Sequence, residues 1–174
     1  MVRVIAGLYK NQSIMSDKKA TIRPTQDRVK AALFSILGDV SGLKVADLFA
    51  GTGNLGIEAL SRGAERCTFV DNNWHSLNLV KHNLAKLKLE QRAEVIRADV
   101  LKYLAQKPLF DLIFADPPYE YLSYNELLIL FGQLRPDTQI VLETDRRFDL
   151  PSSFKPREIK VRRSGDTNLN FIRI

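Results

Sequence analysis

Residues 47–56 read Asp-Leu-Phe-Ala-Gly-Thr-Gly-Asn-Leu-Gly, and this stretch decides the fold. It joins a short apolar run at 44–49 to a helical pattern at 54–62, so it lies where a strand turns into a helix. Its glycines let the backbone approach a ligand closely, and the start of the helix offers free N–H groups. The stretch therefore predicts a ligand-binding loop at the end of a buried strand.

The same order of strand, turn and helix recurs along the chain. Apolar runs that alternate with helical patterns predict an α/β fold, with a parallel, doubly wound sheet covered by helices on both faces. We expect seven strands, at 44–49, 67–71, 93–99, 110–119 and 139–144 and in a terminal antiparallel hairpin at 156–163 and 168–174, and helices at 25–37, 54–62, 74–87, 100–106 and 122–134.

The beginning of the chain is expected to be an extension of this fold. Alternating apolar and other residues in 1–22 predict a small hairpin, followed by the helix that Thr25 opens. No stretch resembles a linker between domains. We therefore expect one domain, 1–174, in which 1–37 is an N-terminal extension and 38–174 is the Rossmann-like core.

Composition excludes several classes of protein. The 174 residues are 45% hydrophobic and 26% charged, unlike a disordered, collagen-like or coiled-coil chain. The single Cys67 excludes an internal disulfide framework, and His75 and His82 lack partners at metal-ligand spacing, so we expect no metal site. No apolar run reaches the roughly 18 residues of a membrane span, and the N-terminus has no secretory signal. We expect a cytoplasmic protein, a monomer, with no membrane partner.

Charge is distributed unevenly. Residues 1–30 carry seven basic and two acidic side chains, and 151–174 carry six and two, whereas 31–150 carry 13 and 16. Two basic ends thus flank a mildly acidic body. This distribution is typical of a surface that binds a nucleic acid or another polyanion, and a merely solvated surface stays open as the alternative.

The glycine-rich stretch has two interpretations. Gly51, Gly53 and Gly56 match the spacing of a dinucleotide-binding fingerprint, and Asp71, 20 positions after Gly51, is suited to accept hydrogen bonds from a ribose. Asp47, however, places a negative charge where a pyrophosphate gains nothing from it. A carboxylate there suits an ammonium or sulfonium group, so S-adenosylmethionine is favoured over NAD, which stays open as the alternative.

The tetrapeptide Asp116-Pro117-Pro118-Tyr119 follows another apolar run. Two prolines stiffen the loop and remove two backbone donors. Hydrogen-bond acceptors on Asp116 and on the Pro117 carbonyl, beside the ring of Tyr119, would form a slot for a planar amine such as the exocyclic NH2 of a base. The tetrapeptide by itself is also compatible with an ordinary turn. In a doubly wound sheet the first and fourth strands are neighbours, which predicts that this loop lies beside the glycine turn.

Taken together, these motifs resemble those of the RsmD-type 16S ribosomal RNA guanine-N2 methyltransferases. The resemblance covers nearly the whole length, through RVIAG (3–7), RPTQDRVKAALFSIL (23–37), DLFAGTGNLGIEALSRGA (47–64), DPPY (116–119) and GDTNL (165–169). It implies a class I methyltransferase fold, S-adenosylmethionine as the donor, and a guanine of small-subunit rRNA as the acceptor. Because a chain of this length has little room for an RNA-recognition domain, we expect a small-subunit particle that contains protein to supply part of the specificity.

The resemblance also suggests roles for individual residues. The catalytic residues would be Asp116, Pro117 and Tyr119; the cofactor-binding residues Asp47, Phe49, Ala50, Gly51, Gly53, Asp71, Asn72, Asp99 and Val100; and the substrate-binding residues Arg23, Thr25, Arg28 and Pro118. Asp99 and Thr25 serve equally well as ordinary helix caps. The alternatives left open are an adenine-N6 methyltransferase acting on DNA or RNA, an NAD-dependent oxidoreductase and a non-catalytic RNA-binding protein.

Overall fold

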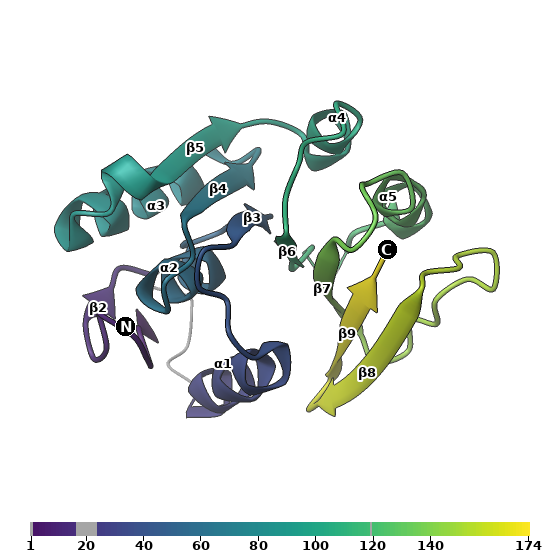
Figure 1. The fold of residues 1–174 in the computed structure, drawn as a ribbon, viewed down its shortest axis with the longest axis horizontal. Coiled ribbons are helices and arrows are strands. Elements are labelled where there is room, and N and C mark those ends of the chain that lie inside the picture. The colour runs from purple at the N-terminus through teal and green to yellow at the C-terminus, as the bar shows by residue number, and fades with distance from the viewer. Residues whose placement is uncertain (1, 17–23, 119) are drawn as a thin grey trace.

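Seven strands form one sheet in the order β5-β4-β3-β6-β7-β9-β8 in the computed structural model (Figure 1). The structure describes residues 2–16, 24–118 and 120–174. The large sheet consists of β3 (Lys44–Leu48), β4 (Arg66–Asp71), β5 (Ala93–Arg97), β6 (Leu112–Ala115), β7 (Gln139–Asp145), β8 (Glu158–Ser164) and β9 (Thr167–Arg173). The five strands from β5 to β7 are parallel, and β9 is antiparallel to both of its neighbours. The predicted doubly wound sheet with a terminal antiparallel hairpin is confirmed.

Helices cover both faces of the sheet, as the alternating pattern predicted. One face packs against α1 (Pro24–Leu37), α2 (Asn54–Ser61) and α3 (Trp74–Leu87), and the other against α4 (Val100–Leu104) and α5 (Tyr124–Phe131) (Figure 1). We call these the α1 face and the α5 face. Side chains alternate between them along each strand, so that Val45 packs on the α1 face while Ala46 and Leu48 pack on the α5 face.

Several elements are shorter than predicted, and two of them differ most. The strand expected at 110–119 ends at Ala115, because Pro117 and Pro118 have no N–H to continue the ladder. The helix expected at 122–134 is confined to Tyr124–Phe131. By contrast, the helix expected at 74–87 has the predicted bounds, since Asn73 caps its first turn by accepting hydrogen bonds from the N–H groups of His75 and Ser76.

The N-terminal hairpin pairs β1 (Val2–Arg3) with β2 (Ser13–Ile14), and a short 3-10 helix, Glu90–Arg92, precedes β5. The hairpin lies beside α2 and α3, and its Val4 and Ile14 join the core on the α1 face (Figure 1). The N-terminal segment is thus packed onto the fold rather than separate from it. Within the part of the chain that the structure describes, no helix is long and apolar enough to cross a membrane.

Candidate active site at the carboxyl edge of the sheet

The ends of β3 and β6 bring the two sequence motifs together. The strands are parallel neighbours, with Asp47 beside Phe114 and Leu48 beside Ala115. The glycine turn leaves β3 at Leu48 and the Asp116 loop leaves β6 at Ala115, so both start at the same level of the sheet. The predicted proximity of the two motifs is confirmed, although 63 residues separate Gly53 from Asp116 in sequence.

The turn between β3 and α2 has the left-handed backbone that its glycines permit. Gly51 has φ 54° and Gly53 has φ 77°, and even Phe49 adopts φ 59°. Gly56 serves packing instead, because a Cβ on it would lie 2.4 Å from the Phe69 ring and 2.7 Å from the Cys67 sulfur. The first glycines therefore shape the loop, and Gly56 lets α2 approach the sheet closely.

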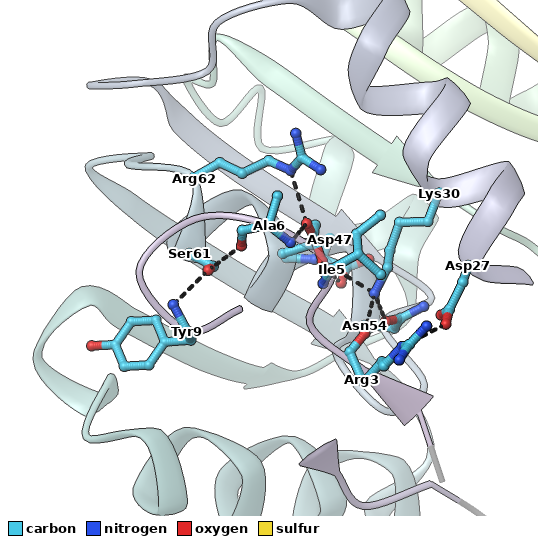
Figure 2. A network of polar contacts seen from close by, with 12 residues as sticks. Arg3, Ile5, Ala6, Tyr9, Asp27, Lys30, Asp47, Asn54, Ser61 and Arg62 are labelled. Carbon is cyan, nitrogen blue, oxygen red and sulfur yellow. Dashed lines mark hydrogen bonds and ion pairs between the residues drawn. The ribbon is translucent and has the colours of Figure 1, made fainter. Parts of the chain in front are cut away.

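Asp47 lies beneath this turn. Its side chain is only 4% exposed, and one carboxylate oxygen accepts a hydrogen bond of 2.8 Å from the Gly56 N–H (Figure 2). Burial raises the pKa of Asp47 to about 8, and the nearby carboxylates of Asp116 and Asp71 act in the same direction, whereas the Gly56 hydrogen bond opposes them. A positive charge above the turn would relieve this strain on the ionised carboxylate.

Asp71, at the end of β4, connects two loops. One oxygen accepts a hydrogen bond of 2.9 Å from the Gly51 N–H, and the other accepts one of 2.8 Å from the Asn73 N–H. The residue thus fixes the glycine turn against the start of α3. Each carboxylate oxygen has two lone pairs, so this bonding leaves acceptor capacity for the ribose hydroxyls that the sequence predicted as its partners.

The third strand end carries Asp99 and Val100. Asp99 caps α4, with its carboxylate accepting a hydrogen bond of 3.0 Å from the Lys102 N–H, and Val100 is buried in the α5-face core. Capping the helix is sufficient to explain an Asp at position 99. The predicted contact of Asp99 and Val100 with adenine stays a prediction. The neighbouring predicted residue, Asn72, lies in the β4–α3 connection and accepts a 3.3 Å hydrogen bond from the Arg97 side chain through its carbonyl. Ala50 is buried beside these loops, and its N–H donates to the Val70 carbonyl at 3.1 Å.

The loop after β6 presents Asp116 to the site. Asp116 reaches solvent, Pro117 is buried and Pro118 is exposed, while Tyr119 lies outside the described residues. Protein atoms still surround the Asp116 carboxylate closely enough for burial, followed by the charge of Glu143, to raise its pKa to about 7. An acid with this pKa exchanges a proton readily near neutral pH.

An aromatic row that the sequence analysis missed spans the two motif loops. The Phe49 and Tyr121 rings pack edge to face, with their centroids 5.1 Å apart. The ring centroids of Tyr121 and Tyr124 are 5.3 Å apart, and those of Tyr124 and Phe148 are 4.4 Å apart. Phe49 belongs to the glycine turn and Tyr121 to the loop after Asp116. The packing therefore ties the positions of the two loops to each other.

A buried polar network behind the glycine turn was also missed (Figure 2). Glu58 of α2 is fully buried, accepts hydrogen bonds from the Ile5 and Ala6 N–H groups and forms ion pairs with Lys30 and Arg62 at 3.2 and 2.8 Å. The Lys30 ammonium also donates to the Asn54 side chain at 2.7 Å. The signal was a lone acid inside the apolar helix sequence NLGIEALS, since such a buried charge requires partners.

The predicted substrate residues lie at the start of α1. Arg23 is outside the described residues. Thr25 belongs to the first turn of α1, where only its backbone is described, and Arg28 is exposed one turn further on. Among residues 2–16, 24–118 and 120–174, no group of three or more His, Cys, Asp or Glu side chains is arranged to hold a metal ion.

Comparison with known proteins agrees with this architecture. Residues 2–173 match the family model described as conserved hypothetical protein 95. The chain is 41% identical over 160 residues to the putative rRNA methyltransferase YlbH of Bacillus subtilis, covering 87% of each chain. It is 37% identical over 153 residues to ribosomal RNA small subunit methyltransferase D of Haemophilus influenzae, covering 83% of this chain and 79% of the relative.

Solved structures share the fold over nearly the whole chain. The putative methyltransferase yhhF from Escherichia coli has a TM-score of 0.82 at 28% identity, and a putative methylase from Haemophilus influenzae has 0.82 at 32%; each alignment covers 99% of this chain and 97% of the other. A more distant putative methyltransferase, complexed with SAH, has a TM-score of 0.69 at 20% identity and covers 95% of this chain and 52% of the other. From the family match and these identities, the chain belongs to the family described as conserved hypothetical protein 95, which includes the ribosomal RNA small subunit methyltransferase D proteins.

Proposed function

We propose that this protein transfers a methyl group from S-adenosylmethionine to the exocyclic N2 amine of a guanine in small-subunit ribosomal RNA. The observation that carries the proposal is the position of Asp116, directly after β6, which is the strand next to the one that leads into the glycine turn. A site for a cationic methyl donor and an acceptor for an amine thereby share one edge of the sheet. The relatives named as small-subunit rRNA methyltransferases support RNA as the substrate.

The residues of the turn fit the donor. Asp47 is a buried carboxylate whose raised pKa reflects unfavourable burial of its charge, so it complements a ligand that carries ammonium and sulfonium groups. Gly51 leaves open space where a side chain would begin, since the atom nearest to a Cβ there would be the Phe49 carbonyl oxygen at 3.9 Å. Asp71 would hold the ribose, and Asn72, Asp99 and Val100 would border the adenine.

When bound, S-adenosylmethionine supplies a methyl group on a positively charged sulfur, so that transfer breaks the S–C bond, forms an N2–C bond and leaves a neutral thioether. Guanine N2 is a poor nucleophile because its lone pair is delocalised into the ring. Asp116 accepts one N2–H, and its charge stabilises the positive charge that develops on N2 during attack. Asp116 then takes the proton that N2 loses and returns it to water, a task that a pKa of about 7 suits.

Positioning supplies the rest of the rate enhancement. The loop after β6 is stiffened by two prolines, and the Tyr121 N–H donates a hydrogen bond of 2.8 Å to the Pro118 carbonyl. The packing of Tyr121 on Phe49 then holds this loop against the glycine turn. A guanine inside an RNA helix must leave its stack to reach such a slot.

The experiment is radiolabelled methyl transfer to rRNA from cells that lack the enzyme, followed by identification of the labelled nucleoside. We expect N2-methylguanosine. Replacement Asp116→Asn should lower kcat by at least about 100-fold, as loss of a transition-state acceptor does, and leave cofactor affinity within about threefold. The exposed Asp149 is the matched control, so Asp149→Asn should behave as the wild type.

Three results would contradict the proposal. Labelled N6-methyladenosine would show that the protein methylates adenine rather than guanine. Absence of label with every RNA offered would favour a non-catalytic RNA-binding protein. Equal loss of turnover and cofactor binding in Asp116→Asn would remove Asp116 from the acceptor side of the site.

A further inference from the structure

Glu143 lies beside Asp116 at the edge of the sheet, and the proposed mechanism leaves it without a role. The register of β6 and β7 ends with Ala115 opposite Leu142. The residues that follow these two in sequence are Asp116 and Glu143. Phe114 and Val141, two positions earlier on each strand, both pack in the α1-face core. By the alternation of strands, Glu143 points to the α1 face, the face on which Asp47 also lies.

Thr167 holds Glu143 from the next strand. In the antiparallel ladder of β7 and β9, Glu143 is opposite Leu169 and Asp145 is opposite Thr167, so Thr167 lies one pleat from Glu143 on the same face. Its side chain hydrogen-bonds the Glu143 carboxylate, which lowers the pKa of Glu143 against the larger, opposite effect of burial. The GDTNL stretch thus connects the last hairpin to the active-site edge.

Asp116 and Glu143 together favour a ligand with several N–H donors. Burial raises the pKa of both carboxyl groups, and the charge of Glu143 raises that of Asp116 further. Burial raises the pKa of Tyr124 on α5, and the charges of Asp116, Asp145 and Glu143 raise it further. Two partly desolvated acceptors side by side are unfavourable in free energy until a ligand donates a hydrogen bond to each of them.

A guanine edge meets this requirement. N2 carries two N–H bonds, which Asp116 and the Pro117 carbonyl would use, and the adjacent N1 carries a third. We propose that Glu143 accepts the N1–H of the target guanine and that Thr167 is the residue that positions Glu143 for this contact. Adenine has a lone pair at N1 and would face the Glu143 carboxylate with a second acceptor. Glu143 therefore determines specificity for guanine, an inference that rests on the proposed function.

The test combines one substitution in the protein with one substitution in the target base and compares the four resulting values of kcat/KM. Once the target guanosine is mapped, splinted ligation replaces it with 2-aminopurine riboside, which keeps the 2-amine but has a lone pair at N1. The wild type should favour guanine over 2-aminopurine by about 100-fold or more in kcat/KM, because an unpaired polar group would be buried against the analogue. Replacement Glu143→Gln, whose amide can donate to that lone pair, should reduce this preference at least tenfold.

Controls separate recognition from folding. Glu126→Gln changes an exposed acid on α5 and should keep the wild-type preference. Glu143→Gln should bind cofactor and melt as the wild type does. Thr167→Val should reduce the base preference in the same direction, and Thr167→Ser, which restores the hydroxyl, should recover it.

Each outcome decides between the two proposals. If the wild type makes N2-methylguanosine but Glu143→Gln slows guanine and 2-aminopurine equally, Glu143 does not contact N1 and the inference is wrong. If Thr167→Val leaves the preference unchanged, Thr167 has no positioning role. If the wild type makes no N2-methylguanosine at all, the proposed function itself fails, whatever Glu143 does.

Discussion

Three carboxylates at the edge of the sheet have different surroundings, which suit them to the different roles that we propose for them. Asp47 is buried under the glycine turn, Asp71 has a backbone N–H on each oxygen, and Asp116 reaches solvent from a stiff loop. Asp47 carries the largest penalty for its charge, so it gains most from a cationic ligand. Asp116, with a pKa of about 7, is suited to take up the proton that the proposed reaction removes from the acceptor amine.

Cofactor binding should therefore release a proton from Asp47. Because its pKa is raised to about 8, Asp47 is about nine-tenths protonated at pH 7, and a bound cation lowers that pKa and expels the proton. Calorimetry of S-adenosylmethionine binding at pH 7, in buffers of different ionisation enthalpy, measures the release. Affinity should rise with pH and level off above about pH 8.

Asp47→Asn is the matched variant, since it keeps the shape of the side chain and carries no titrating proton. The release should be smaller in this variant by close to one proton. Asp116 and Asp71 are the charged groups that face Asp47, and both are unchanged in it. Equal release in the two proteins would mean that Asp47 is already ionised before the cofactor arrives.

The sequence predicts the edge carboxylates but not their neighbour Glu143. Asp47, Asp71 and Asp116 each follow an apolar run in a strand–helix repeat, and parallel strands bring such positions to one edge whatever the details of packing. Glu143 becomes part of the site only through the register of β7 with β6 and β9. That register depends on tertiary pairing, which no local pattern encodes.

Helix α2 is placed by contacts at both of its ends. At its start, Gly56 approaches the sheet and its N–H is bound by Asp47. Further along, Glu58 receives two N–H groups of the N-terminal segment and the Lys30 ammonium from α1. The N-terminal extension therefore stabilises α2 and, through it, the glycine turn. A lone Glu in an apolar helix indicates such partners, but only the structure identifies them.

Replacement Gly56→Ala should shift α2 away from β4. The new Cβ would lie 2.4 Å from the Phe69 ring and 2.7 Å from the Cys67 sulfur, both fully packed, so overpacking should cost about 1–3 kcal/mol in the free energy of unfolding. Because Gly56 also donates to Asp47, cofactor affinity should fall in the same variant. Urea denaturation and calorimetry measure the two effects.

Gly132→Ala is the control for Gly56→Ala. Gly132 follows α5 with a φ of −64°, and a Cβ there would meet only backbone oxygens at 3.5 Å or more. It should leave cofactor affinity unchanged and alter stability by less than about 1 kcal/mol in either direction. If Gly56→Ala also leaves cofactor affinity and stability nearly unchanged, α2 can move without disturbing the glycine turn.

Part of the basic C-terminal segment, 151–174, lies beside the end of α1. Ile36 and Leu37, at the end of α1, line a cavity together with Lys160 of β8 and Phe171 of β9. Arg162 of β8 is opposite Leu169, which is in turn opposite Glu143. Arg162 is thus level with the proposed base slot, two strands or roughly 10 Å away from Glu143. That spacing suits a phosphate next to a flipped-out nucleotide.

Binding to rRNA should become less sensitive to salt when Arg162 is replaced. Each neutralised phosphate contributes about 0.7–0.9 to the slope of log K against log salt, so Arg162→Ala should lower the slope by roughly one contact, measured between about 50 and 200 mM salt. Arg66 is the control, because it is exposed at the amino end of β4, opposite the carboxyl edge that carries the site. Its replacement should leave the slope unchanged. If the Arg162 and Arg66 variants give the same slope as the wild type, the RNA does not cross the β8 edge. The basic N-terminal end, residues 1–30, must then supply the phosphate contacts instead.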